Sequence, residues 1–161
     1  MYTSLVRSIV KLNWIPYPPA LTQMYIQFLG ALATAQSTYL PMILSCLLGE
    51  FTDVSQVPNG KRTDLQVNAH WAIQHLLDLV PSGHTILLRL IRENFPHKSA
   101  DRREQISYVF NLIRISQYAH HLKGDILSLC IERVVRVDVL PLTREFLTEG
   151  GNTIRIRQIG R

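Results

Sequence analysis

The sequence predicts an all-α protein in which pairs of helices stack along one direction. Apolar residues recur at steps of three and four, the spacing of one face of an α-helix. Prolines and glycines separate these periodic blocks, and the helices between them come in twos. The first helices of successive pairs begin near residues 21, 63 and 101, so the unit repeats about every 40 residues.

The first pair is predicted between residues 21 and 51, after a short helical segment over residues 2–13 that the prolines at 16, 18 and 19 end. One apolar face of its first helix comprises Leu21, Met24, Tyr25, Phe28, Leu29 and Leu32. Pro41 falls near the start of the second helix, Leu40–Phe51. Proline is tolerated in a first helical turn because the amide there has no partner within the helix.

A loop is predicted over 52–62, where Pro58, Asn59 and Gly60 occur. Thr63 and Gln66 have capping-box spacing and are expected to start the second pair. The stripe that follows consists of Leu65, Ala69, Ala72, Leu76 and Leu79. Residues 84–95 form a shorter helix that is apolar on more than one side, which predicts that neighbours cover it on both sides.

Asp101 and Glu104 form another capping-box pair and open the third pair. Its first helix carries Ile106, Val109, Phe110 and Ile113, and its second carries Ile126, Leu127, Cys130, Val134 and Val137. One pair cannot bury its own apolar face, so neighbouring pairs must stack. We therefore predict a HEAT/armadillo-like α-solenoid of about three helix pairs. A plain helical bundle is the alternative.

The chain divides into a helical-repeat segment, residues 1–138, and an atypical basic tail, residues 139–161, that carries glycines and four arginines. The tail is expected to be mobile. In the whole chain, 17 Lys and Arg outnumber 12 Asp and Glu, giving a net charge of +5. This balance permits contact with an acidic protein face or with nucleic acid without demonstrating either.

Motifs that carry chemistry are absent from the sequence. There is no Gly-x-Ser-x-Gly, no P-loop and no Gly-rich dinucleotide fingerprint. The six histidines are best interpreted as surface residues, because His70 and His75 are five apart and do not share a helix face. Cys46 and Cys130 are expected to be small core residues. We predict a protein that is no enzyme and has no cofactor and no metal.

No stretch reaches the roughly 18 consecutive apolar residues that span a bilayer, so no contact with a membrane is expected. One charged run stands out, between residues 89 and 104. Its cations are a candidate partner-binding ridge for an acidic protein, and they are Arg89, Arg92, Lys98, Arg102 and Arg103. A solvated loop between repeats is the alternative. Without interleaved exposed aromatic residues, the run is a poor platform for single-stranded nucleic acid.

Three segments together resemble a known family. They are "LVRSIVKLNW", "YIQFLGALATAQSTYL" and "HLLDLVPSGHTILLRLIRENFPHKSADRREQISYVFNLIRISQYAHHLKGDILSLCIERVVRVDV". In this order they resemble the RNA polymerase I-specific transcription initiation factors. The most specific parts are Val-Pro-Ser at 80–82, Phe-Pro at 95–96 and Asn-Leu-Ile-Arg-Ile-Ser at 111–116. The resemblance runs from Leu5 to Val139.

The resemblance implies a HEAT-repeat scaffold that binds RNA polymerase I and bridges it to promoter-bound initiation factors. It implies location in the nucleus and nucleolus, and no cofactor. Family members are several times longer and tend to carry an acidic, serine-rich loop where this chain has "TDVSQVPNGKRT". We therefore expect a truncated version of such a factor. Two alternatives remain: a general HEAT-type adaptor that binds a helix or peptide in its groove, and a basic module that contacts nucleic acid.

Overall fold

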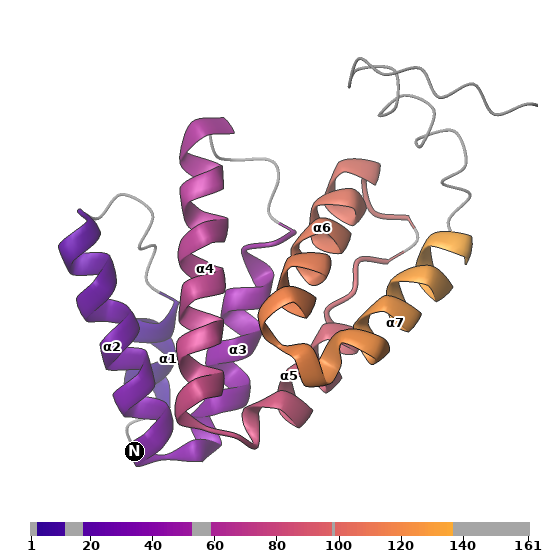
Figure 1. Ribbon diagram of the computed structural model, residues 1–161. Helices are drawn as coiled ribbons and strands as arrows, with labels where there is room; N and C mark the ends of the chain where they lie inside the picture. The colour runs from indigo at the N-terminus through magenta and orange to yellow at the C-terminus, as the bar shows by residue number, and fades with distance from the viewer. Residues whose placement is uncertain (1–2, 12–17, 53–58, 98, 137–161) are drawn as a thin grey trace, which may run out of the picture.

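The computed structural model describes residues 3–11, 18–52, 59–97 and 99–136, and within these ranges not the side chains of Thr3, 59–65 and 134–136 (Figure 1). The helices form three successive pairs, as predicted. They are α2 (Pro19–Ala35) with α3 (Leu40–Gly49), α4 (Asn59–Leu79) with α5 (Gly83–Glu93), and α6 (Arg102–Tyr118) with α7 (Lys123–Arg136). Short 3-10 turns, η1 (Ser37–Tyr39) and η2 (His120–Leu122), join the helices of the first and third pairs.

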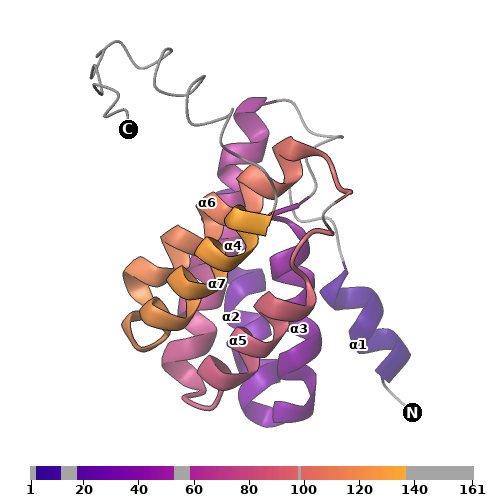
Figure 2. The same cartoon turned by 90° about the vertical axis from the view of Figure 1, so that its right-hand side faces the viewer.

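The pairs stack in register to form two layers. The first helices α2, α4 and α6 contact one another in sequence, and we call them the first-helix layer. The second helices α3, α5 and α7 do the same and form the second-helix layer. An additional helix, α1 (Thr3–Val10), packs beside α3 at one edge (Figure 2). The prediction of an all-α solenoid of about three helix pairs is confirmed.

Local signals mark the starts of three helices. Pro41 occupies the first turn of α3, as expected. Pro19, which was expected to end the preceding segment, occupies the first turn of α2. At the start of α6, Asp101 Oδ1 accepts a hydrogen bond from the Arg103 backbone amide at 3.4 Å. The predicted start at Thr63 is wrong, because α4 begins at Asn59. The first turn of α4 consists of residues that were predicted to belong to the loop. A helix start there is compatible with Pro58 just before it.

The core is continuous from the first pair to the third. Helix α3 lies deepest, and it buries Leu40, Ile43, Leu44, Leu47 and Leu48. Each such side chain contributes about 1.5–3 kcal/mol on full burial. In α5, Leu87, Leu90 and Ile91 are buried while Arg89 and Arg92 face solvent. Because repeated units bury apolar surface only against their neighbours, stacking is the source of this core.

Four predicted apolar faces are wrong in part. Leu79 of the α4 face is 43% exposed and Leu127 of the α7 face is 37% exposed. The predicted Leu65, Val134 and Val137 lie outside the described side chains. In α2 the buried residues are Thr22, Ile26, Leu29, Gly30 and Ala33. Leu21, Met24 and Phe28 of the predicted face are instead 48%, 63% and 41% exposed. In α6, Tyr108, Leu112 and Ile115 are fully buried, whereas the predicted Phe110 and Ile113 are 59% and 39% exposed. Both helices carry more apolar residues than one buried face accommodates.

Helices α2 and α4 approach closely at Gly30. A Cβ atom at this position would lie 2.8 Å from His75 Nε2 and 2.8 Å from Leu79 Cδ1. Both distances are shorter than van der Waals contact, and both atoms are the ends of side chains. A side chain at position 30 would therefore require His75 and Leu79 to shift.

A buried histidine links the second pair to the third. His70 of α4 is only 4% exposed, so its interpretation as a surface residue is wrong. Its Nε2 lies 2.9 Å from Asn111 Oδ1, and its Nδ1 lies 3.0 Å from Tyr118 Oη. Asn111 Nδ2 donates to the Ser107 carbonyl at 2.8 Å, which leaves Asn111 Oδ1 as acceptor. His70 therefore carries its proton on Nε2 and accepts the Tyr118 hydroxyl proton at Nδ1.

Burial keeps this histidine neutral. It lowers the pKa of His70 to about 4, with a smaller lowering from the Arg114 charge and an opposing effect of the Asn111 hydrogen bond. The ring also stacks on Phe51, with centroids 4.8 Å apart. Burial raises the pKa of the Tyr118 hydroxyl, so this group stays protonated as a donor. All polar atoms of the His70 ring are thus paired inside the core.

Replacing Gly30 by leucine is expected to destabilise the chain, because the new side chain must displace His75 and Leu79. Overpacking of this kind costs about 1–3 kcal/mol. Gly49→Leu is the matched control, since a Cβ at Gly49 meets nothing within 4 Å. Urea unfolding should show a lower midpoint for G30L than for G49L. Equal midpoints would show that the close approach of α2 to α4 is not a constraint.

Acid is expected to weaken the fold through His70. Its pKa is about 4 in the folded chain and about 6.5 when unfolded, so protonation favours the unfolded state. The contribution of the neutral ring is complete above pH 6.5 and is lost as the pH falls toward 4. Between neutral pH and pH 5 the loss amounts to about 2 kcal/mol. The variant His70→Gln lacks this group, so its unfolding free energy should change less over that range; an identical change in both proteins would contradict the assignment.

Candidate partner-binding surfaces

The predicted cationic ridge divides into two groups in the structure. Arg89 and Arg92 belong to α5, and both contact carboxylates: Arg89 Nε lies 3.7 Å from Glu93, and Arg92 lies 3.9 Å from Asp125 of α7. These are exposed pairs, which contribute little to stability but reduce the charge available to a partner. Through its contact with Asp125, Arg92 lies beside the start of α7, at the end of the third pair where η2 joins its helices.

Arg102 and Arg103 form the second group. Both are exposed in the first turn of α6, at the end of that helix opposite η2. Lys98 lies outside the described residues. Two cations in a first turn oppose the helix dipole, at a cost of about 0.3–1 kcal/mol each. Glu104 and the Asp101 cap offset part of this cost. Local folding therefore gives no reason for arginine at these two positions.

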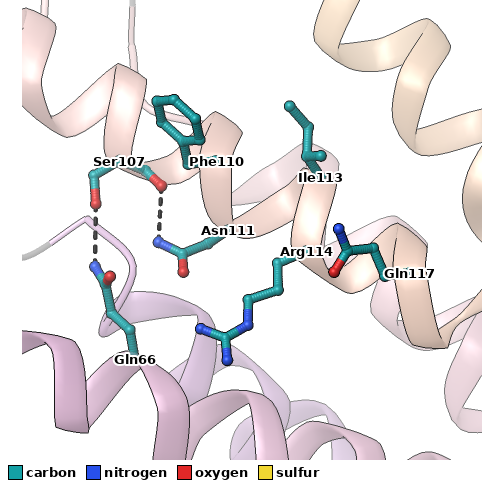
Figure 3. A pocket seen from close by; sticks show the side chains of 7 residues that line it. All are labelled: Gln66, Ser107, Phe110, Asn111, Ile113, Arg114 and Gln117. Atoms are coloured by element: carbon teal, nitrogen blue, oxygen red, sulfur yellow. Dashed lines mark hydrogen bonds between the residues drawn. The ribbon is translucent and has the colours of Figure 1, made fainter. Parts of the chain in front are cut away.

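A pocket that was not predicted from the sequence lies at the seam between α4 and α6. It holds about 450 Å³ and opens on the first-helix layer. Its lining residues come from both helices and are Gln66, Ser107, Phe110, Asn111, Ile113, Arg114 and Gln117. In Figure 3, Gln66 reaches from α4 to Ser107, and Arg114 extends from α6 toward α4.

Hydrogen bonds hold the floor of this pocket. Gln66 Nε2 donates to Ser107 Oγ at 3.1 Å, which is not the capping role predicted for Gln66. Asn111 bonds the Ser107 carbonyl and His70, as described above. The walls differ in character: Phe110 and Ile113 are apolar, and among the described lining residues Arg114 alone carries a charge. The pocket can thus receive an apolar group beside an anionic one.

Metal ligands do not cluster in the part of the chain that the structure describes. No group of three or more His, Cys, Asp and Glu there could hold a metal ion. Cys46 and Cys130 are free thiols, half-buried and buried as predicted, and burial raises the pKa of both. Among the described helices none is by itself long and apolar enough to cross a membrane; α2 and η1–α3 pass that test only together, with a bend of 119°.

The chain is similar to one protein family over nearly its whole length. A family model for the RNA polymerase I specific transcription initiation factor RRN3 matches residues 1–153. The fold is similar to that in the crystal structure of RNA polymerase I transcription initiation factor Rrn3, with a TM-score of 0.71 and 25% identity. That match covers 93% of this chain and 29% of the other.

Individual relatives show the same pattern. The RNA polymerase I-specific transcription initiation factor rrn3 of Schizosaccharomyces pombe is 31% identical over 137 residues, which are 85% of this chain and 22% of the relative. RRN3 of Mus musculus is 28% identical over 151 residues, covering 86% of this chain and 23% of the relative. The chain thus spans about a fifth of the length of the curated relatives it matches.

Proposed function

The chain belongs to the RRN3 family of RNA polymerase I specific transcription initiation factors, and on this premise we propose that it is a protein-binding scaffold and not an enzyme. The family match over residues 1–153 is the observation that carries the proposal. The stacked helix pairs support it, because a solenoid presents long helical surfaces to partners. The sequence also lacks the nucleophile and phosphate-binding motifs of the common enzyme classes.

The proposed partners are RNA polymerase I and promoter-bound initiation factors, and the proposed location is the nucleus and nucleolus. The relatives support both proposals, because they are RNA polymerase I-specific transcription initiation factors. Because the residues of this chain match about a fifth of those relatives, we propose that they perform part of the role. Within the chain, residues 1–138 are the proposed binding unit and 139–161 an appended tail.

Arg102 and Arg103 are the proposed contact residues of the ridge. Arg89 and Arg92 already contact carboxylates of the chain itself, whereas Arg102 and Arg103 stand exposed at the unfavourable end of a helix dipole. Both cations would attract an acidic partner surface placed there. The helix N-terminus would add only a weak attraction, because Asp101 already caps it. The electrostatic gain would appear mainly as specificity and rate of association.

The test is capture of purified RNA polymerase I by the tagged full chain at low salt. We expect the wild-type chain to bind and the double variant R102E/R103E to bind at least about tenfold more weakly. The matched control is R7E/K123E, which makes the same change in charge at two exposed positions outside the ridge. Its binding should stay within about twofold of wild type.

Thermal unfolding of each variant separates binding from folding. A loss of capture in R102E/R103E with an unchanged unfolding midpoint supports the contact. No capture by the wild-type chain, where a full-length relative binds, would refute the proposed function. Equal loss in both double variants would refute the role of Arg102 and Arg103 while leaving the scaffold itself in place.

A further inference from the structure

Helix α2 has a solvent-facing surface without any charge. Its sequence, like the whole stretch between Lys11 and Glu50, contains no Asp, Glu, Lys, Arg or His. Yet Leu21, Met24 and Phe28 are 48%, 63% and 41% exposed. The outer face of a surface helix normally carries charged and polar residues. An uncharged, partly apolar face on this helix therefore calls for a covering partner.

The same character continues across the first-helix layer. Val67 and Trp71 of α4 are 40% and 45% exposed, and Phe110 and Ile113 of α6 are 59% and 39% exposed. Within each helix the two residues are three or four positions apart and so share a face. In the second-helix layer, the described side chains of α3 and α5 include no exposed large apolar residue, and α7 has two, Leu127 and Ile131. Eight of the eleven exposed large apolar side chains among the described residues thus belong to the first-helix layer, and a gathering of this kind marks an interaction surface.

The pocket between α4 and α6 opens on this layer, and its lining residues indicate which ligand chemistry the layer prefers. Arg114 is the one charged residue among its seven lining residues, and no salt bridge joins it to a carboxylate in the described part of the chain. Figure 3 shows its guanidinium extending from α6 toward α4, whereas Phe110 and Ile113 extend from α6 away from α4. A cation beside apolar side chains is complementary to a carboxylate flanked by apolar groups.

We propose that the solvent face of α4 and α6 binds an amphipathic helix of a partner protein. Apolar side chains of that helix would pack on Trp71 and Phe110, and one of its carboxylates would pair with Arg114. Helix-in-groove recognition uses such anchors, three and four residues apart. A nucleic-acid strand fits less well, since tracking its phosphates requires several cations. The inference rests on the proposed scaffold function but not on the polymerase as partner.

The floor of the pocket is suited to binding because it is already ordered. Gln66 bonds Ser107, and Asn111 is held between the Ser107 carbonyl and His70. These hydrogen bonds hold the three side chains in place before a ligand enters. Preorganisation of this kind reduces the entropy lost on association.

The experiment uses the full chain with Trp14→Phe, which leaves Trp71 as the one tryptophan. The probe is a synthetic amphipathic helix with leucines on one face and glutamates on the other, compared with the same peptide carrying lysines. We expect a saturable blue shift of Trp71 emission with the glutamate peptide alone. Arg114→Glu should weaken that binding by about tenfold and Phe110→Ala by at least about fivefold.

Two exposed positions outside this surface provide matched controls. Ile131→Ala removes an apolar side chain from α7 that is 64% exposed, and Arg89→Glu reverses a charge on α5. Both should leave peptide affinity within about twofold of wild type. The proposal is overturned if neither peptide binds, if the lysine peptide binds equally well, or if R114E and F110A bind like the controls.

The same assay also tests two other kinds of ligand, a lipid membrane and a nucleic acid. A shift of Trp71 emission with anionic phospholipid vesicles or single-stranded DNA, but not with the glutamate peptide, would also overturn the proposal. Polymerase capture is measured separately on the R114E and F110A chains. If the wild-type chain captures polymerase and binds no peptide, this inference fails while the proposed function stands. If the chain binds the peptide and captures no polymerase, the proposed function fails while this inference stands.

Discussion

The arrangement of the second and third helix pairs depends on two hydrogen bonds of His70, one donated to Asn111 and one accepted from the Tyr118 hydroxyl. They lie inside the core, and both ring nitrogens are used. If α6 rotated or slid against α4, buried polar groups would lose their partners at about 1–3 kcal/mol each. The network therefore specifies one relative position of the two pairs, where apolar packing alone would permit several. Because Asn111 belongs to this network and also lines the pocket, the network fixes the position of the pocket floor as well.

Much of the fold could be predicted from the sequence because its signals are local. Pro41, Asp101 and the period of about 40 residues act within single helices or pairs, and they are correct. The buried faces of α2 and α6 were not predictable in the same way. Leu21 and Leu29 look alike in the pattern, and only packing against α3 and α4 decides that one is exposed and the other buried.

The candidate site was less predictable because its contacts are distant in sequence. His70 meets Asn111 across 41 residues, and no spacing rule distinguishes it from a surface histidine. The pairing of Arg92 with Asp125 of α7 is equally invisible in the sequence, which shows only a run of cations. One sequence signal does indicate the exposed apolar faces. Helices α2 and α6 carry apolar residues on more than one side, and a helix with this pattern either lies inside the core or binds a partner.

The central claim is that the seam between α4 and α6 is fixed by a cooperative polar network. A double-mutant cycle with His70→Leu, Asn111→Leu and the double variant, followed by urea unfolding, tests it most directly. If the network holds the seam, the two substitutions are coupled and the double variant is more stable than the sum of the single losses predicts, by about 1–2 kcal/mol. Losses that add within about 0.5 kcal/mol would show that the two residues act independently and would contradict the account.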